Sequence, residues 1–159
     1  MSQSTTTCRS SQNQLDTSAD RVRAQTVGIP AEGYHFELTL LPDPALVHGV
    51  RETTANFVGR AGVTGAVAGD VVLVVSELVT NCILHGAGDI CLRVWVVAGT
   101  VRVSVADEGT GQPGIKNVGP DAVSGRGLFL VASLASNWGT GEGETWAEFS
   151  YATPAKDVA

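Results

Sequence analysis

The stretch VVSELVTNCILHG, residues 74–86, places Glu77 and Asn81 four positions apart in an otherwise apolar run. A carboxylate removed from water is costly unless a partner compensates its charge. On a helical wheel, one broad side suits packing on a sheet; it comprises Val71, Val72, Val75, Leu78, Val79, Cys82 and Ile83. The opposite side comprises Glu77, Thr80, Asn81 and His85, interspersed with Leu73, Val74 and Leu84. Because this side is also partly apolar, we expect it to line a cleft with Glu77 and Asn81 on the floor.

The oxygen atoms of Glu77 and Asn81 suit two chemical roles. A pair of oxygen ligands spaced i, i+4 fits a hard cation such as Mg²⁺, whose shell water and phosphate oxygens would complete. A carboxylate in a partly desolvated cleft also suits a general base. Taken alone, the pair fits an exposed or structurally paired position equally well.

Composition narrows the class of protein. The 159 residues include ten Lys and Arg against sixteen Asp and Glu, a formal net charge of −6 without a basic block, which argues against nucleic acid as a direct partner. We expect neither a membrane span nor a signal peptide, and therefore a cytoplasmic protein. The cysteines Cys8, Cys82 and Cys91 form no C-x-x-C motif, so we expect small core residues that do no chemistry.

The N-terminal half of the chain predicts one strand and two helices. Residues 1–33 are rich in Ser, Thr, Gln and Asp and are expected to form a disordered polar tail. Alternating apolar residues predict a strand over 34–40. Asp43 and Pro44 are expected to begin a helix that continues to residue 62, with Leu46, Val50, Thr53 or Thr54, Phe57 and Val58 on its buried side. After a loop over 62–69, Asp70 is expected to cap a helix that ends at Gly86.

The C-terminal half predicts two hairpins and a buried helix. Strands over 89–99 and 100–107 form the first hairpin, and residues 137–140 and 145–151 form the second. Residues 125–136 predict a helix that is apolar nearly all round. This order indicates an α+β, two-layer α/β sandwich, with a mixed, mostly antiparallel sheet and helices on one face. The domain is expected to span 34–153, followed by a short tail over 154–159.

Two glycine motifs add candidate site residues. Asp107 follows the parity of Val101, Val103 and Val105, so it should point inward, and Gly109 and Gly111 follow it. An inward carboxylate beside bare backbone can accept the amino group of adenine, although an Asp-Gly turn has the same sequence. The segment 125–128, GRGL, opens a helix whose free amides suit phosphate, although a flexible hinge is the simpler interpretation. Neither a P-loop nor a dinucleotide-binding G-x-G-x-x-G motif is present.

The order Glu77-x-x-x-Asn81, Asp107-x-Gly109-x-Gly111 and Gly125-x-Gly127 resembles the N, G1 and G2 boxes of the GHKL ATPases. Within that superfamily, SELVTNCILHG and GRGLFLVASLASNWG are similar to the anti-sigma serine kinase branch of bacteria, especially its small actinobacterial members. The resemblance extends over residues 34–151, nearly the whole of the expected domain.

The resemblance implies ATP and Mg²⁺ as ligands and a role for each matched position. Asn81 would hold Mg²⁺ and Glu77 would be the catalytic base, while Asp107 would accept the adenine amino group. The remaining nucleotide-binding positions would be Gly109 and Gly111 at the base, Thr145 supporting the adenine site, Gly125, Gly127 and Leu128 at the phosphates, and His85 and Arg126 on the phosphate side.

The resemblance implies a serine/threonine protein kinase that phosphorylates an anti-sigma factor antagonist, a STAS-like protein, and sequesters a sigma factor. The alternative is a nucleotide-gated module that clamps a partner without catalysis. One departure from the family favours it slightly: Glu144 replaces a common lysine. A second departure, a short lid over 111–125 with Lys116 as its only cation, bears on phosphate closure and catalytic rate. A homodimer is also possible by family analogy, through the first helix around Arg51 and Glu52.

Overall fold

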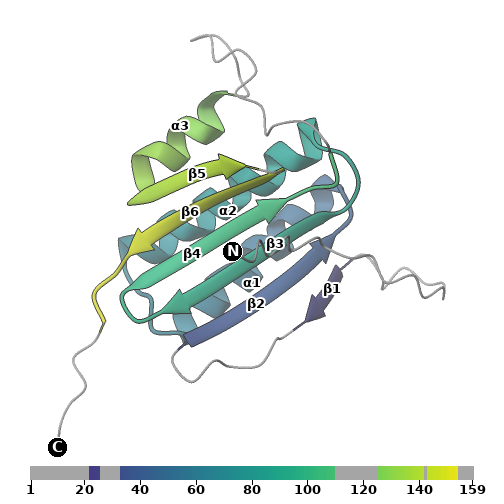
Figure 1. The fold of residues 1–159 in the computed structure, drawn as a ribbon. Helices are drawn as coiled ribbons and strands as arrows, with labels where there is room; N and C mark the ends of the chain where they lie inside the picture. Colours follow the sequence, from purple (N-terminus) through teal and green to yellow (C-terminus); the bar gives the residue numbers. More distant parts are fainter. Residues whose placement is uncertain (1–21, 26–32, 110–124, 142, 154–159) are drawn as a thin grey trace, which may run out of the picture.

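The computed structural model describes residues 22–25, 33–109, 125–141 and 143–153, within which six strands form one antiparallel sheet of order β1-β2-β3-β4-β6-β5. The strands are β1 (Val22–Gln25), β2 (Gly33–Leu40), β3 (Ile90–Val97), β4 (Thr100–Ala106), β5 (Asn137–Gly141) and β6 (Glu144–Ser150). The helices are the 3₁₀ turn η1 (Pro44–Leu46), α1 (Val47–Arg60), α2 (Ala66–His85) and α3 (Gly125–Leu134). Figure 1 shows α1 and α2 behind the sheet and α3 beside β5. The predicted α+β two-layer sandwich is confirmed, and each strand pairing described is antiparallel.

The core lies between the helices and the inner face of the sheet. The register aligns Phe36, Val94, Val103 and Ala147 in one row across β2, β3, β4 and β6, and all four are buried. The alternation of apolar and polar residues therefore selects this face. The turn between β3 and β4 depends on Gly99, whose φ of 80° favours glycine.

The first helical segment follows the predicted pattern closely. Asp43 caps η1 by accepting a hydrogen bond from the amide two residues on, and α1 continues from that turn. Thr54 rather than Thr53 is buried, and its hydroxyl donates to the Val50 carbonyl over 2.8 Å. Phe57 packs edge-on against Phe36, with ring centroids 4.6 Å apart, so α1 is anchored on β2.

Helix α2 is the central helix of the core. Its buried residues are Val71, Val74, Val75, Ser76, Leu78 and Val79. Its length and hydropathy also meet the criteria for a membrane span, but buried core helices meet them too. Since α2 packs against α1, α3 and several strands, a core role explains its apolar character.

Two predictions about α2 are wrong. The helix begins at Ala66 after Gly65, so Asp70 is not the cap and residues 66–69 are not part of a loop. Gly65 has a φ of 72°, which turns the chain into the helix. Val74 is completely buried rather than lining a cleft. The reason is that α1 and α3 pack beside α2, so more of its circumference is covered than the sheet alone would cover.

Two further predictions fail at the edges of the fold. The expected disordered tail over 1–33 contains a strand at its C-terminal end, because residues 22–25 pair antiparallel with residues 37–40 of β2. The prediction that the third helix is buried nearly all round is also wrong. Val131 is completely buried, but Phe129 is 74% exposed, because α3 lies at the edge of the domain and packs through one side only.

The outer face of the sheet carries a separate set of polar and aromatic contacts. The His35 and Trp95 rings stack with centroids 5.0 Å apart, and the Arg93 guanidinium bonds Glu37 over 2.8 Å. His35 Nε2 is buried and has no hydrogen-bond partner within the described part of the chain. Burial lowers the pKa of His35, Glu37 opposes this change and Arg93 adds to it.

A lowered histidine pKa links stability to acid pH. The unfolded chain, with a His35 pKa near 6.5, binds the proton more readily than the folded protein. The stability that neutral His35 contributes is fully present above pH 6.5 and is lost as the pH falls below 6.5. We therefore expect the urea midpoint, followed by tryptophan fluorescence, to fall between pH 7.5 and 5.5. His35→Phe, which keeps a stacking ring but cannot titrate, should reduce that fall, whereas His48→Gln on exposed α1 should not. Equal falls in all three proteins would contradict the assignment.

Candidate nucleotide site

The side chains of Glu77 and Asn81 converge on the first turn of α3. Both are half-buried on α2. A Cβ placed on Gly127 would lie 2.9 Å from Asn81 Nδ2 and 3.3 Å from Glu77 Oε2. The absence of a side chain at Gly127 thus lets the backbone of α3 approach a carboxylate and an amide closely. The structure brings together three predicted site residues that are up to 50 positions apart in sequence.

The chemistry of this pair suits a metal whose shell is completed by a bound ligand. The described residues contain no group of three His, Cys, Asp or Glu able to hold a metal ion without help. Magnesium commonly takes one or two protein oxygens and completes its shell with water and phosphate. The side-chain oxygen of Asn81, next to Gly127, fits that partial role.

The first turn of α3 presents the glycine motif as expected. Gly125 and Arg126 form the start of the helix, although their side chains lie outside the description. Gly127 is buried against α2, and Leu128 packs half-buried on the core. A phosphate at this helix start would therefore meet the backbone amide of Leu128 rather than its side chain.

Asp107 lies at the end of β4, and its carboxylate is held from two sides. Gly109 donates its backbone N–H to Asp107 Oδ1 over 2.7 Å. On the other side, a Cβ placed on Gly86 would collide with Asp107 Oδ2. The half-buried carboxylate therefore packs directly on the end of α2, as its inward parity predicted.

The loop after α2 is attached to the residues that follow Asp107. Glu108 donates its backbone N–H to the Ala87 carbonyl over 2.9 Å, and its side chain accepts from the Asp89 amide over 3.3 Å. Gly88, with a φ of 68°, passes so close to Glu108 that a Cβ there would collide with its carboxylate. Residues 86–89 and 107–109 therefore form one connected unit.

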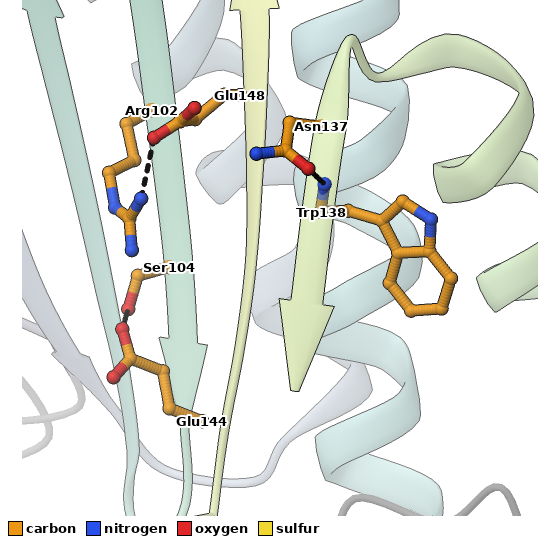
Figure 2. A network of polar contacts seen from close by, with 6 residues as sticks. All are labelled: Arg102, Ser104, Asn137, Trp138, Glu144 and Glu148. Carbon is orange, nitrogen blue, oxygen red and sulfur yellow. Dashed lines mark hydrogen bonds and ion pairs between the residues drawn. The ribbon is translucent and has the colours of Figure 1, made fainter. Parts of the chain in front are cut away.

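Thr145 and Glu144 point to opposite faces of the sheet. Thr145 is buried on the inner face opposite Val105, as its parity predicted. Glu144 accepts a hydrogen bond from Ser104 on the outer face, along the same pair of strands as the ion pair between Arg102 and Glu148 (Figure 2). Glu144 therefore belongs to the outer face, whereas Thr145 belongs to the core.

The remaining predicted positions are exposed or lie outside the residues that the structure describes. His85 is exposed in the last turn of α2, one turn beyond Asn81. Gly111, Lys116 and the predicted lid belong to residues 110–124, which are not among those described. The Asp107 carboxylate, in contrast, packs closely against Gly86 at the end of α2.

Sequence interpretation missed the contribution of Cys82. The half-buried thiol lies close enough to Asp107 for the carboxylate to shift its pKa, so it is more than a small core residue. Burial, followed by the neighbouring charge of Asp107 and hydrogen bonding with it, together raise the pKa of Cys82 to about 12. The helical wheel placed Cys82 on the sheet-facing side, and strand parity pointed Asp107 inward. Considering the two patterns together could have indicated this contact.

Comparison with known proteins gives two matches. The family described as the histidine kinase-like ATPase domain matches residues 40–149, which is most of the chain. An anti-sigma F factor from Geobacillus stearothermophilus is 38% identical over 71 residues, covering 42% of this chain. The chain matches 49% of the length of that relative.

The raised pKa of Cys82 predicts a loss of stability at alkaline pH. The unfolded thiol loses its proton near pH 9 while the folded thiol keeps it to about pH 12, so stability falls as pH rises through this window. We expect Cys82 to account for about 1 kcal/mol per pH unit above pH 9. Urea unfolding at pH 7.5, 9 and 10 should show a smaller decline in Cys82→Ala than in the wild type. Identical slopes would show that the thiol is not linked to folding.

Proposed function

Because the chain belongs to the histidine kinase-like ATPase domain family, we propose that it binds Mg-ATP and transfers the γ-phosphoryl group to a serine or threonine of a partner protein. The convergence of Glu77 and Asn81 on Gly127 supports this proposal most directly. The ATP-binding unit would extend over residues 34–153, where the described core lies.

The roles of the residues follow from their positions. Glu77 would accept the proton of the attacking hydroxyl, and Asn81 would supply an oxygen ligand to Mg²⁺. Asp107 would accept the adenine amino group, with Gly109 and Gly111 beside the base and the Thr145 hydroxyl supporting that end of the site. Phosphoryl transfer demands mainly positioning and charge neutralisation, so a few such groups suffice.

The phosphate end would be formed by the start of α3. The free amides of residues 125–128 carry partial positive charge and suit phosphate oxygens. Gly125 and Gly127 would allow these oxygens to approach, while Arg126 and His85 would contribute on the phosphate side. Bound Mg²⁺ would neutralise part of the negative charge of the phosphates.

The partial similarity to an anti-sigma F factor supports the choice of partners. The phosphorylated protein would be a STAS-like anti-sigma factor antagonist, and a sigma factor would be sequestered when that antagonist is phosphorylated. This role would need no direct nucleic acid contact, in agreement with the net charge of −6, and would be carried out in the cytoplasm. A homodimer would use α1 around Arg51 and Glu52, both exposed.

A nucleotide-gated clamp without turnover is the competing function. Its support came partly from Glu144, and the contact of Glu144 with Ser104 on the outer face weakens that support. The half-buried Glu77 next to Asn81 favours a catalytic site. The two functions differ in one measurable quantity, the transfer of phosphate to the partner.

A conservative substitution at Glu77 tests catalysis separately from binding. Glu77→Gln keeps the size of the side chain but cannot accept the proton. We expect unchanged ATP affinity by calorimetry and a loss of transfer to a STAS-like antagonist of about 100-fold or more, measured with γ-labelled ATP. Wild-type transfer by this variant would remove Glu77 from the mechanism. ATP binding by the wild type without transfer to any antagonist tested would support the clamp.

Two glycine substitutions separate the site from helix stability. Alanine at Gly127 would place a methyl group 2.9 Å from Asn81 Nδ2, so Asn81 must move. We expect at least a tenfold loss of Mg-ATP affinity in Gly127→Ala, with the fold retained. Gly69→Ala is the matched control, because its Cβ meets nothing within 4 Å. It should raise stability by up to about 1 kcal/mol without changing affinity. Equal ATP affinity in both variants, by thermal-shift titration, would show that Gly127 does not border the site.

A further inference from the structure

Glu108 attaches the connection between α2 and β3 to the end of β4. Its backbone N–H donates to the Ala87 carbonyl over 2.9 Å, and its carboxylate accepts from the Asp89 amide over 3.3 Å. These two hydrogen bonds lie on either side of Gly88. Glu108 therefore holds the connection at two points, although Glu108 itself lies at the surface of the protein.

Two separate constraints require glycine at position 88. The φ of Gly88 is 68°, in the left-handed region that favours glycine. A Cβ at this position would also collide with the Glu108 carboxylate and lie 2.8 Å from the Glu108 Cβ. Gly99 has a similar φ of 80°, but among the described residues its Cβ would approach the Tyr151 carbonyl oxygen most closely, at 3.9 Å. The close contact with Glu108 therefore distinguishes Gly88 from a glycine that its turn alone requires.

The attached connection lies beside the base end of the proposed site. The strand register puts the start of β3, the end of β4 and the start of β6 at one end of the sheet. On one side of Asp107 lies Gly86, whose φ of −88° any residue can adopt but whose Cβ would collide with Asp107 Oδ2. On the other side, a Cβ on Gly143 would lie 3.5 Å from the Gly109 carbonyl oxygen. Residues 107–109 are therefore held between the connection after α2 and the turn before β6.

We infer that Glu108 is a positioning residue of the nucleotide site, which holds residues 86–89 on the end of β4 and thereby fixes Asp107 relative to the last turn of α2. This inference rests on the proposed function, in which Asp107 meets the base and Asn81 meets Mg²⁺ at the phosphates. A nucleotide that spans both ends binds more tightly when their separation is already fixed, because a loose connection must be ordered on binding. Glu108 acts through this connection and needs no contact with the nucleotide.

Calorimetric titration of the full chain with Mg-ATP tests this role. We expect Glu108→Ala to bind ATP about three- to tenfold more weakly than the wild type, because one hydrogen bond to the connection is lost. Glu108→Gln loses the charge but keeps an oxygen that can accept from the Asp89 amide, so it should retain most of the affinity. Glu148→Ala is the matched control, because it removes a carboxylate that bonds Arg102 on the outer face of the same sheet. Its ATP affinity should equal that of the wild type.

A pair of glycine substitutions tests the same contact from the other side. Gly88→Ala and Gly99→Ala both place alanine at a positive φ, so both should lose stability in urea. We expect only Gly88→Ala to weaken ATP binding, because its methyl group displaces the Glu108 carboxylate. The losses of affinity in Gly88→Ala and Glu108→Ala should be less than additive in the double variant, since both remove one contact. Equal ATP affinity in the two glycine variants contradicts the inference.

The outcomes separate this inference from the proposed function. ATP binding by the wild type with unchanged affinity in Glu108→Ala overturns the positioning role alone, and so do equal losses in Glu108→Ala and Glu108→Gln. Failure of the wild type to bind ATP overturns both proposals.

A nucleotide-free measurement tests the attachment itself. Hydrogen exchange of the Asp89 amide, followed by NMR, should be at least several-fold faster in Glu108→Ala than in the wild type, because its acceptor is removed. Glu108→Gln should exchange at nearly the wild-type rate. Equal exchange rates in the wild type and Glu108→Ala overturn the proposed attachment, whether or not the protein binds ATP.

Discussion

The packing of α2 between the sheet and the other two helices is the constraint on which the structure depends. Its valines and Leu78 meet the inner faces of β3, β4 and β6, while α1 and α3 cover much of the remainder. Burial of this apolar surface is the main favourable term available to a domain of this size. A helix held so closely leaves a narrow polar strip, and Glu77 and Asn81 occupy it.

The same packing makes glycine a necessary part of the candidate site. Gly127 of α3 and Gly86 at the end of α2 both lie where a methyl group would meet a polar side chain. At Gly127 those neighbours are Asn81 and Glu77, and at Gly86 the neighbour is Asp107. Close approach, rather than unusual backbone geometry, explains the glycine at position 86. These glycines allow the polar groups to be enclosed without distorting the core around them.

The two faces of the sheet carry different kinds of side chains. The inner face is apolar and ends in Asp107 and Thr145, which lie toward the helices. The outer face holds Arg102 over Trp146, 4.4 Å from the ring centroid, together with ion pairs and the contact of Glu144. Because strand residues alternate between faces, neighbours in sequence such as Glu144 and Thr145 belong to separate environments. A substitution at Glu144 therefore changes contacts of the outer face without directly changing the surroundings of Thr145.

Local periodicity was sufficient for most elements and for the direction of several side chains. Alternation over residues 34–40 specified β2, and parity alone pointed Asp107 and Thr145 inward, because strand and helix periods are properties of the backbone. The burial of Val74 and the strand at 22–25 were missed, since each depends on a neighbouring element that covers or pairs with it. The start of α2 was missed because Gly65, through its positive φ and not through a capping side chain, turns the chain into the helix. The contacts of Gly127 with Asn81 and of Asp107 with Cys82 and Gly86 join segments distant in the chain. These contacts form only when α3 and β4 pack against α2, and the periodicity of the sequence does not predict them.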